Sequence, residues 1–215
     1  MAHPQAHGTA SQKKSLHADE RDTQRVEEAR KHFGEEVSLI DPKQLIFLDE
    51  SGANLAMTRL YGRGLIGKRV VGSAPHNYGP NVTMVGAMGV HGVSAAMSFE
   101  GAMNGDVFRV FIEQVLAPTL KPGEVVVMDN LSAHKVQGTR EAIGRTGASL
   151  LYLPPYSPDF SPIEQCWSKV KTLLRKAKAR TLETLNDAID DAIGKVTSSD
   201  ANGWFRHCGY GLNSF

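Results

Sequence analysis

The sequence predicts an α/β fold in which helices cover a mixed central sheet, and three observations support this class. Short continuous apolar runs, at residues 45–48 and 125–128, are typical of buried strands. The apolar positions of residues 106–116 instead recur at helical spacing. Strand-like and helix-like segments alternate along the chain, which is the order expected for a sheet flanked by helices.

Composition places the chain among ordinary globular proteins. Its 215 residues carry 24 Lys and Arg against 23 Asp and Glu, and 41% are hydrophobic, which excludes general disorder. No apolar run approaches the roughly 18 residues of a membrane helix. Two cysteines are too few for a disulfide scaffold, so we expect a reducing, cytoplasmic location. Because the net charge is only +1, a nucleic-acid partner has to be argued from local charge.

The chain is expected to divide near residue 43. Residues 1–43 are polar and charged, and they predict a partly helical, solvated extension that is too polar to form a core alone. Residues 44–215 carry the apolar patterning of a folded domain. Its first strand, residues 45–48, is predicted to end at Asp49 and to be followed by a loop rich in glycine and arginine. A hairpin is then expected over residues 81–99.

The second half of this domain alternates helices and strands. A helix is expected over residues 106–116, with Asn104 or Asp106 as its cap. Strands follow at 125–128, ending at Asp129, and at 149–153, with a helix between them at 133–145. After a proline-rich turn, Ser161 is predicted to cap a helix that has Pro162 in its first position and runs to about residue 179. The last expected helix covers residues 182–196.

Three acidic residues stand where such a sheet would bring them together. Asp49 and Asp129 follow two buried strands, and ligand sites in open α/β sheets lie at strand ends. Glu164 falls in the first turn of the helix after the proline-rich turn. Carboxylates that converge repel each other unless a cation joins them, and an all-oxygen site favours Mg²⁺ or Mn²⁺.

Each acid also has a structural alternative. A single aspartate at a strand end is usually a turn former or a helix cap. Ser161 and Glu164 have the spacing of a capping box, in which the glutamate bonds back to the cap residue and not to a metal. Glu50 is expected on the opposite face of its strand from Asp49, and Asp159 is expected to shape its turn.

The sequence around the three acids is more specific for a protein family than any single acid. It reads Phe47-Leu48-Asp49-Glu50, then Asp129-Asn130-Leu131-Ser132-Ala133-His134, then Pro154-Pro155-Tyr156-Ser157-Pro158-Asp159 with Pro162-Ile163-Glu164. With these blocks, residues 44–180 resemble the catalytic domain of mariner-type DDE transposases, in particular their bacterial insertion-sequence branch. The resemblance implies a ribonuclease-H-like fold and a catalytic triad of Asp49, Asp129 and Glu164. It also implies possible supporting roles for Asn130 and His134.

The resemblance further implies the chemistry. Two Mg²⁺ ions, replaceable by Mn²⁺, are expected, with Asp49 bridging them and Asp129 and Glu164 each completing one. They would serve hydrolysis at a transposon end and then transfer of the 3′-hydroxyl into target DNA at a TA dinucleotide. Relatives carry N-terminal helix-turn-helix modules for which residues 1–43 are too short. We therefore expect a catalytic domain alone. The resemblance further implies that it acts at the bacterial nucleoid and that it pairs as a homodimer on DNA.

Local positive charge supplies the candidate DNA contacts. The helix that carries Glu164 continues with six basic residues and no acid over residues 165–180, and the loop after Asp49 adds two arginines. A solvated helix face is the alternative explanation. The candidate DNA-binding residues are Lys169, Lys171, Arg175, Lys176, Lys178, Arg180, Arg59 and Arg63.

Two other functions stay open from the sequence. The missing N-terminal modules suit a truncated or inactive transposase remnant that only binds DNA or dimerises. The implied fold also suits a ribonuclease-H-like nuclease that acts on RNA–DNA hybrids. The proline-rich block before Glu164 favours the transposase over this nuclease.

Overall fold

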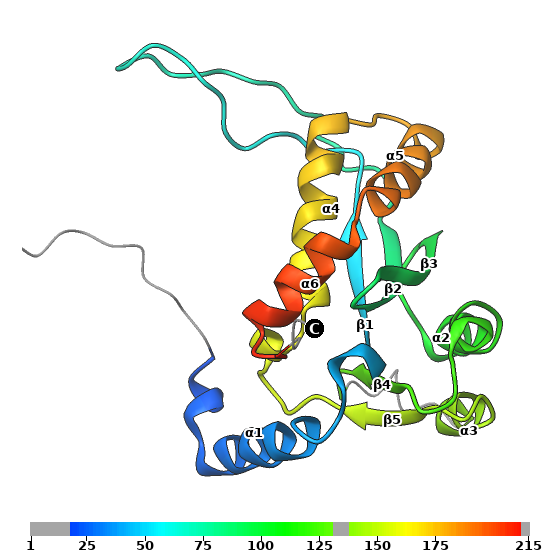
Figure 1. The fold of residues 1–215 in the computed structure, drawn as a ribbon. Coiled ribbons are helices and arrows are strands. Elements are labelled where there is room, and N and C mark those ends of the chain that lie inside the picture. Colours follow the sequence, from blue (N-terminus) through cyan, green and yellow to red (C-terminus); the bar gives the residue numbers. More distant parts are fainter. Residues whose placement is uncertain (1–17, 131–137, 212–215) are drawn as a thin grey trace, which may run out of the picture.

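A five-stranded mixed sheet forms the centre of the computed structural model, which describes residues 18–130 and 138–211 (Figure 1). In space the strands follow the order β3-β2-β1-β4-β5. β1 is antiparallel to β2 and parallel to β4, and β4 is parallel to β5. The predicted α/β class and the predicted hairpin of β2 and β3 are confirmed. The strands are β1 (Leu45–Ala53), β2 (Val82–Gly89), β3 (Gly92–Glu100), β4 (Val125–Met128) and β5 (Ser149–Tyr152).

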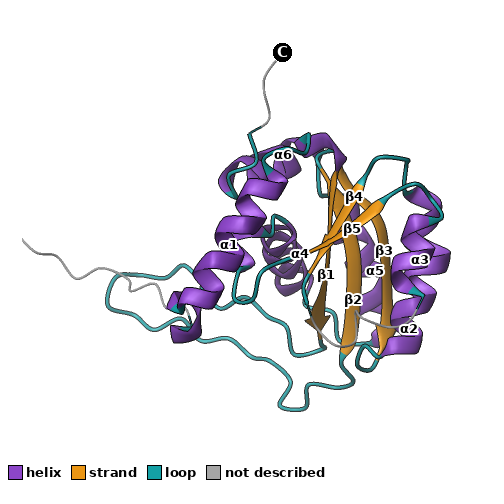
Figure 2. Ribbon diagram, turned by 90° about the horizontal axis from the view of Figure 1, so that it is seen from below, coloured by secondary structure: helices purple, strands orange, loops and turns teal. Residues whose placement is uncertain are grey.

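Helices cover both faces of the sheet, and alternation along β1 supplies apolar side chains to each. Leu45 and Phe47 join one core and Ile46 and Leu48 the other. Figure 2 shows α1 and α4 on one side of the sheet and α2 and α3 on the other. The first face packs against α1 (Gln24–Val37), α4 (Ile163–Ala177), α5 (Leu182–Gly194) and α6 (Ser198–His207). The second packs against α2 (Gly105–Val110), a π-helical continuation (Phe111–Leu116) and α3 (Thr139–Gly144).

Helix α4 lies close against the middle of the sheet. Its buried side chains recur at helical spacing and include Trp167 and Val170. Trp167 lies over Gly86 of β2, where an added Cβ would come within 3.0 Å of the tryptophan ring. Gly86 pairs with Asp49 of β1, so the absence of a side chain at this position lets α4 approach the strand that carries the first acid.

The structure corrects the predicted boundaries of the first strand and of the helix that carries Glu164. β1 does not end at Asp49 but runs on to Ala53, because its pairing with β2 extends beyond its pairing with β4. Helix α4 begins at Ile163 with Pro162 as its N-cap, and within the described residues no side chain caps it. The predicted Ser161 cap is therefore wrong, and so is the capping box. The helix ends at Ala177, two residues before the predicted end.

Two further helices differ from the expectation. The extension was predicted to be solvated, but α1 buries Val26 and Phe33. Helix α6 was not predicted, although Thr197 and Asp200 form a capping box at its start.

Asn104 caps α2 as predicted, by accepting hydrogen bonds from the backbone amides of Asp106 and Val107. Of the helix predicted at 133–145, the part from 138 lies in the described residues and contains α3.

Residues 54–81, all of them described, form a long loop without helix or strand, as the glycine-rich sequence predicts. The loop projects from the body beyond the C-terminal end of α4 (Figure 1). Arg180 braces its base by donating from Nη1 to the carbonyl oxygens of Leu55 (2.7 Å) and Met57 (3.2 Å). Among the helices that the structure describes, none has the length and apolar character to cross a membrane.

Candidate active site

Parallel pairing of β1 with β4 brings Asp49 and Asp129 level with each other. Phe47 pairs with Val127, and the two aspartates are each two residues further on, Asp49 within β1 and Asp129 directly after the end of β4. Phe47 and Val127 both belong to the core beneath α4, and alternation places the two aspartates on this same face. The sheet thus presents both carboxylates toward the helix that carries Glu164. Glu50, one residue further along β1, shares the opposite face with Leu48, as predicted.

Glu164 completes this group from the first turn of α4. A cavity of about 360 Å³ is lined by all three acids together with Asn130 and the proline-rich loop that precedes the helix. The cavity thus joins residues from two strands, one helix and one loop that lie far apart in the sequence. Its lining consists of Leu48, Asp49, Asp129, Asn130, Leu153, Pro154, Pro155, Tyr156, Ser157, Pro158, Ser161 and Glu164.

Among the three acids of the cavity, the partly buried Asp49 has a strongly raised pKa. Burial raises the pKa of its carboxyl from 3.8 to about 7, and the negative charges of Glu164 and Asp129 act in the same direction. A hydrogen bond from the backbone of Glu50 lowers the pKa but does not outweigh burial. The charges of Glu164, Asp129 and, least of all, Glu50 are therefore felt at the Asp49 carboxyl, and a cation would stabilise such a site.

The donor set fits a divalent metal ion such as Mg²⁺ or Mn²⁺, because all three side chains supply carboxylate oxygens. Within residues 18–130 and 138–211, no three His, Cys, Asp or Glu side chains stand close enough to hold one ion as they are placed. The three side chains nevertheless line one cavity, and the charges of Glu164 and Asp129 contribute to the raised pKa of Asp49.

Asp49→Asn is expected to stabilise the metal-free protein above pH 7. Because the pKa of Asp49 is raised on folding, its contribution to stability is lost as pH rises from about 4 to about 7. One pKa unit corresponds to about 1.4 kcal/mol. Allowing for partial exposure of the carboxyl, we expect the variant to gain about 1–3 kcal/mol at pH 8. Urea unfolding in EDTA at pH 4 and pH 8 measures this gain, and an equal effect at both pH values would contradict the assignment.

Of the other residues considered for the site, one lines the cavity, one lies outside the described residues and one makes contacts elsewhere. Asn130 lines the cavity beside Asp129. His134 lies outside the described residues, so its supporting role stays a prediction. Asp159 is not part of the described cavity lining, and its carboxylate pairs with Arg30 (2.6 Å) and Arg21 (3.1 Å). Asp159 thus ties its loop to α1, a role that the sequence did not reveal because about 130 residues separate the partners.

The candidate DNA-binding residues fall into three groups. Lys169 faces inward, where its Nζ binds Asp200 (2.5 Å) and the carbonyl oxygen of Lys195 (2.8 Å), and Arg180 braces the long loop. Lys171 and Arg175 line a hollow of about 310 Å³ between α4 and the base of that loop. The others are exposed on the end of α4 or on the loop itself, and they are Lys176, Lys178, Arg59 and Arg63.

Comparison with protein families gives one match. A family model described as DDE superfamily endonuclease matches residues 44–186, more than half of the chain. The matched range contains Asp49, Asp129 and Glu164. A search of curated protein sequences finds no match.

Comparison with solved structures supports the same fold. The Mos1 transposase paired-end complex with left transposon end has a TM-score of 0.70 at 13% identity, over 94% of this chain and 63% of that chain. The Mos1 mariner paired-end complex with Mn has a TM-score of 0.70 at 14% identity, with the same coverage. The catalytic domain of Mos1 mariner transposase has a TM-score of 0.61 at 10% identity, over 90% of this chain and 91% of that chain. This chain thus spans 63% of the Mos1 chains in the paired-end complexes, and the predicted ribonuclease-H-like fold is confirmed.

Proposed function

This chain belongs to the DDE superfamily endonucleases, and we propose that it is a transposase catalytic domain that cleaves DNA phosphodiesters with divalent metal ions and joins the freed 3′-hydroxyl to target DNA. The observation that carries the proposal is the single cavity that Asp49, Asp129 and Glu164 line together. The Mos1 relatives of similar fold include complexes with a transposon end and with Mn.

The three acids would act as the ligands of two metal ions. Bound Mg²⁺ or Mn²⁺ would supply Lewis acidity for activating an oxygen nucleophile and for relieving charge on the phosphate. Asp49 is held by pairing of β1 with β2, where it lies opposite Gly86, so its backbone has little positional freedom. Its pKa of about 7 without a cation makes metal affinity depend on pH in the physiological range. Glu164 stands on a helix and brings the third carboxylate from the opposite wall.

A cleavage assay tests this function and separates its alternatives. The chain is incubated with duplex DNA carrying a transposon-end-like 3′-terminus and with Mg²⁺ or Mn²⁺, and nicked and joined products are counted. Metal-dependent nicking and joining of duplex DNA is expected. Binding without any cleavage would instead indicate an inactive remnant. Preferential cleavage of the RNA strand in a hybrid would indicate a ribonuclease-H-like nuclease.

We expect Lys171 and Arg175 to contact DNA phosphates beside the site. The double variant Lys171→Ala/Arg175→Ala should bind duplex DNA roughly tenfold more weakly, because two counterion-releasing contacts are lost. The slope of log affinity against log salt should fall by about 2. Fluorescence anisotropy at several salt concentrations measures both quantities.

A matched control removes the same charge elsewhere. Lys121 and Arg145 are exposed near the turns that precede β4 and β5, at the opposite end of these strands from Asp129. Lys121→Ala/Arg145→Ala should leave the salt slope unchanged. Equal losses in both double variants would mean that only net charge attracts DNA, and they would contradict the assigned contacts.

We further propose that two copies pair on DNA and that the chain acts at the bacterial nucleoid, where its substrate lies. The long loop supports pairing, because it exposes large apolar side chains that the body of the protein does not cover, namely Leu60, Tyr61, Leu65, Ile66 and Val71. Light scattering of the chain with and without DNA tests this pairing.

A further inference from the structure

The proline-rich loop between β5 and α4 is one wall of the active-site cavity. Residues 153–158 and Ser161 line the cavity directly, and the loop leads into α4 only a few residues before Glu164. Tyr156 has a φ of 54°, in the left-handed region that a residue other than glycine rarely adopts. Such a conformation persists only where the surrounding structure holds it.

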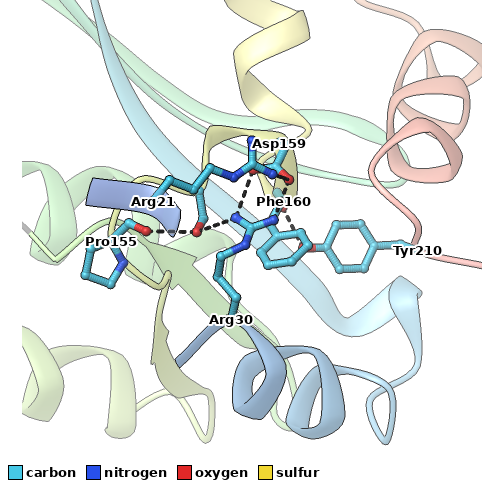
Figure 3. A network of polar contacts seen from close by, with 7 residues as sticks. Arg21, Arg30, Pro155, Asp159, Phe160 and Tyr210 are labelled. Carbon is cyan, nitrogen blue, oxygen red and sulfur yellow. Dashed lines mark hydrogen bonds and ion pairs between the residues drawn. The ribbon is translucent and has the colours of Figure 1, made fainter. Parts of the chain in front are cut away.

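Arg30 of α1 makes the largest set of polar contacts to the loop. Its Nη1 donates to Ser157 Oγ (2.7 Å) and to Asp159 Oδ1 (3.0 Å), and its Nη2 donates to Asp159 Oδ2 (2.6 Å). Ser157 Oγ in turn donates to the carbonyl oxygen of Pro155 (3.0 Å). Figure 3 shows the guanidinium of Arg30 facing Asp159, with Pro155 at the other end of the network. One side chain thus binds Ser157, which lines the cavity, and Asp159, two residues further along the same loop.

Aromatic stacking from α1 and a hydrogen bond from the segment after α6 also hold the loop. The Phe160 ring stacks on Phe33 of α1 with centroids 5.5 Å apart, and the Arg30 guanidinium carbon lies 4.2 Å from the Phe160 centroid. The hydroxyl of Tyr210 donates to the carbonyl oxygen of Phe160 (2.5 Å; Figure 3). Residues 157–160 are therefore held between α1 and the segment after α6.

Arg30 is the stronger of the two arginine contacts to Asp159. The side chain of Arg30 is 16% exposed and makes a bidentate contact, whereas that of Arg21 is 31% exposed and makes a single contact at 3.1 Å. Partial burial tends to raise the pKa of Asp159, but the hydrogen bonds and charge of Arg30, with the charge of Arg21, hold this pKa below its usual value. The carboxylate is therefore kept ionised for the pair.

The fold carries this constraint directly to Glu164. The amides of Phe160 and Ser161 donate to the carbonyls of Ser157 and Pro158, and the amide of Glu164 donates to the carbonyl of Ser161. Successive turns therefore connect the residues that Arg30 binds with the first turn of α4. A displacement of residues 157–159 would move the cavity wall and the start of the helix together.

We propose that Arg30 is a positioning residue of the active site, which acts through residues 157–160 to hold the cavity wall and Glu164 in place for metal binding. This inference rests on the proposed function, because it assigns Glu164 to metal binding. It gives α1, the polar helix that precedes the catalytic domain in the sequence, a direct role in shaping the site.

The test measures metal binding and backbone opening as well as cleavage. Arg30→Ala is expected to weaken Mn²⁺ binding, measured by calorimetry, by about 10- to 100-fold, the range found for residues that orient metal ligands. Amide hydrogen exchange over residues 157–166 should become faster with no metal present. Arg30→Lys keeps the charge but cannot form the bidentate contact, so it should restore only part of the affinity.

Two controls separate positioning from general destabilisation. Lys31→Ala changes the neighbouring exposed residue of α1, which pairs only loosely with Glu35 (3.9 Å), and it should leave metal binding and exchange unchanged. Asp159→Asn removes the partner charge, and it should reproduce the Arg30→Ala effect without adding to it in the double variant.

Each outcome bears on one claim. Unchanged Mn²⁺ affinity in a folded Arg30→Ala protein, or in Asp159→Asn should the former not fold, would overturn the positioning role. Faster exchange with unchanged Mn²⁺ affinity would overturn it too, because the loop would then open without affecting the site. If the wild-type protein neither binds Mn²⁺ nor cleaves DNA, the proposed function fails, and with it the role of Arg30 in metal binding.

Discussion

Asp129→Asn is expected to reduce Mg²⁺-dependent DNA cleavage on the order of a thousandfold, while the protein stays folded. The substitution keeps the shape of the side chain and removes one of the three carboxylate charges at the cavity. Loss of a metal ligand removes the stabilisation of the reacting phosphate, whereas the sheet that carries the residue is unchanged. Cleavage of a labelled duplex, with circular dichroism and thermal unfolding of the same sample, measures both parts.

Glu50→Gln is the matched control for this loss. It removes an acidic charge one residue from Asp49, but from the opposite face of β1. Cleavage should remain within about threefold of the wild-type rate, since Glu50 does not line the cavity and its charge is the smallest of those that act on Asp49. Equal losses in Asp129→Asn and Glu50→Gln would contradict the assignment of the cavity as the active site.

Phe205→Ala is expected to destabilise the whole domain by about 3–5 kcal/mol. Phe205 of α6 is fully buried, and its ring packs edge-on against Phe47 of β1 with centroids 5.4 Å apart. It also contacts Tyr210, which holds the proline-rich loop. Truncation leaves a cavity beneath the strand that carries Asp49. Urea unfolding followed by tryptophan fluorescence measures the loss.

The neighbouring exposed residue of α6 provides the comparison. His207→Ala should change stability by no more than about 0.5 kcal/mol, as is usual for surface positions. If Phe205→Ala were equally mild, α6 would not be part of the domain core. If Phe205→Ala lowered the stability of only one of two separate unfolding transitions, α6 would likewise not belong to the core of the whole domain.

Apolar patterning was enough to predict β4 and the start of β1, because these segments are buried on both faces of the sheet. The run at β4 predicted its bounds without error, Val125–Met128. The first strand was harder, since only its start is apolar. Beyond Leu48 it continues through Asp49, Glu50, Ser51 and Gly52, which are strand residues because β2 pairs with them. Pairing between segments far apart in sequence is not encoded in the local pattern.

Helix boundaries failed where tertiary contacts replaced local signals. Ser161 and Glu164 have the spacing of a capping box, yet Pro162 is the N-cap of α4 and Ser161 lines the cavity. Helix α6 has a weak apolar pattern with asparagine and glycine in its middle, and its burial against Phe47 is what stabilises it.

The three acids of the site could be predicted from the sequence, but the residues that hold them in place could not. Asp49, Asp129 and Glu164 could be proposed from strand ends and from the motif that surrounds them. Arg30 carried no signal, because it lies in a charged helix among many similar residues and its partner is more than 120 residues away. Lys169 shows the converse, since a basic residue on the expected DNA-binding helix instead ties α4 to α6.

Crystals of the chain with a DNA end and Mn²⁺ test the central claim most directly. Anomalous scattering at the manganese edge locates the ions independently of the surrounding density. Peaks are expected inside the cavity of Asp49, Asp129 and Glu164, at a coordination distance of about 2.0–2.2 Å from their carboxylate oxygens. DNA bound at the cavity without manganese between these three side chains, or manganese bound only elsewhere on the chain, would contradict the claim.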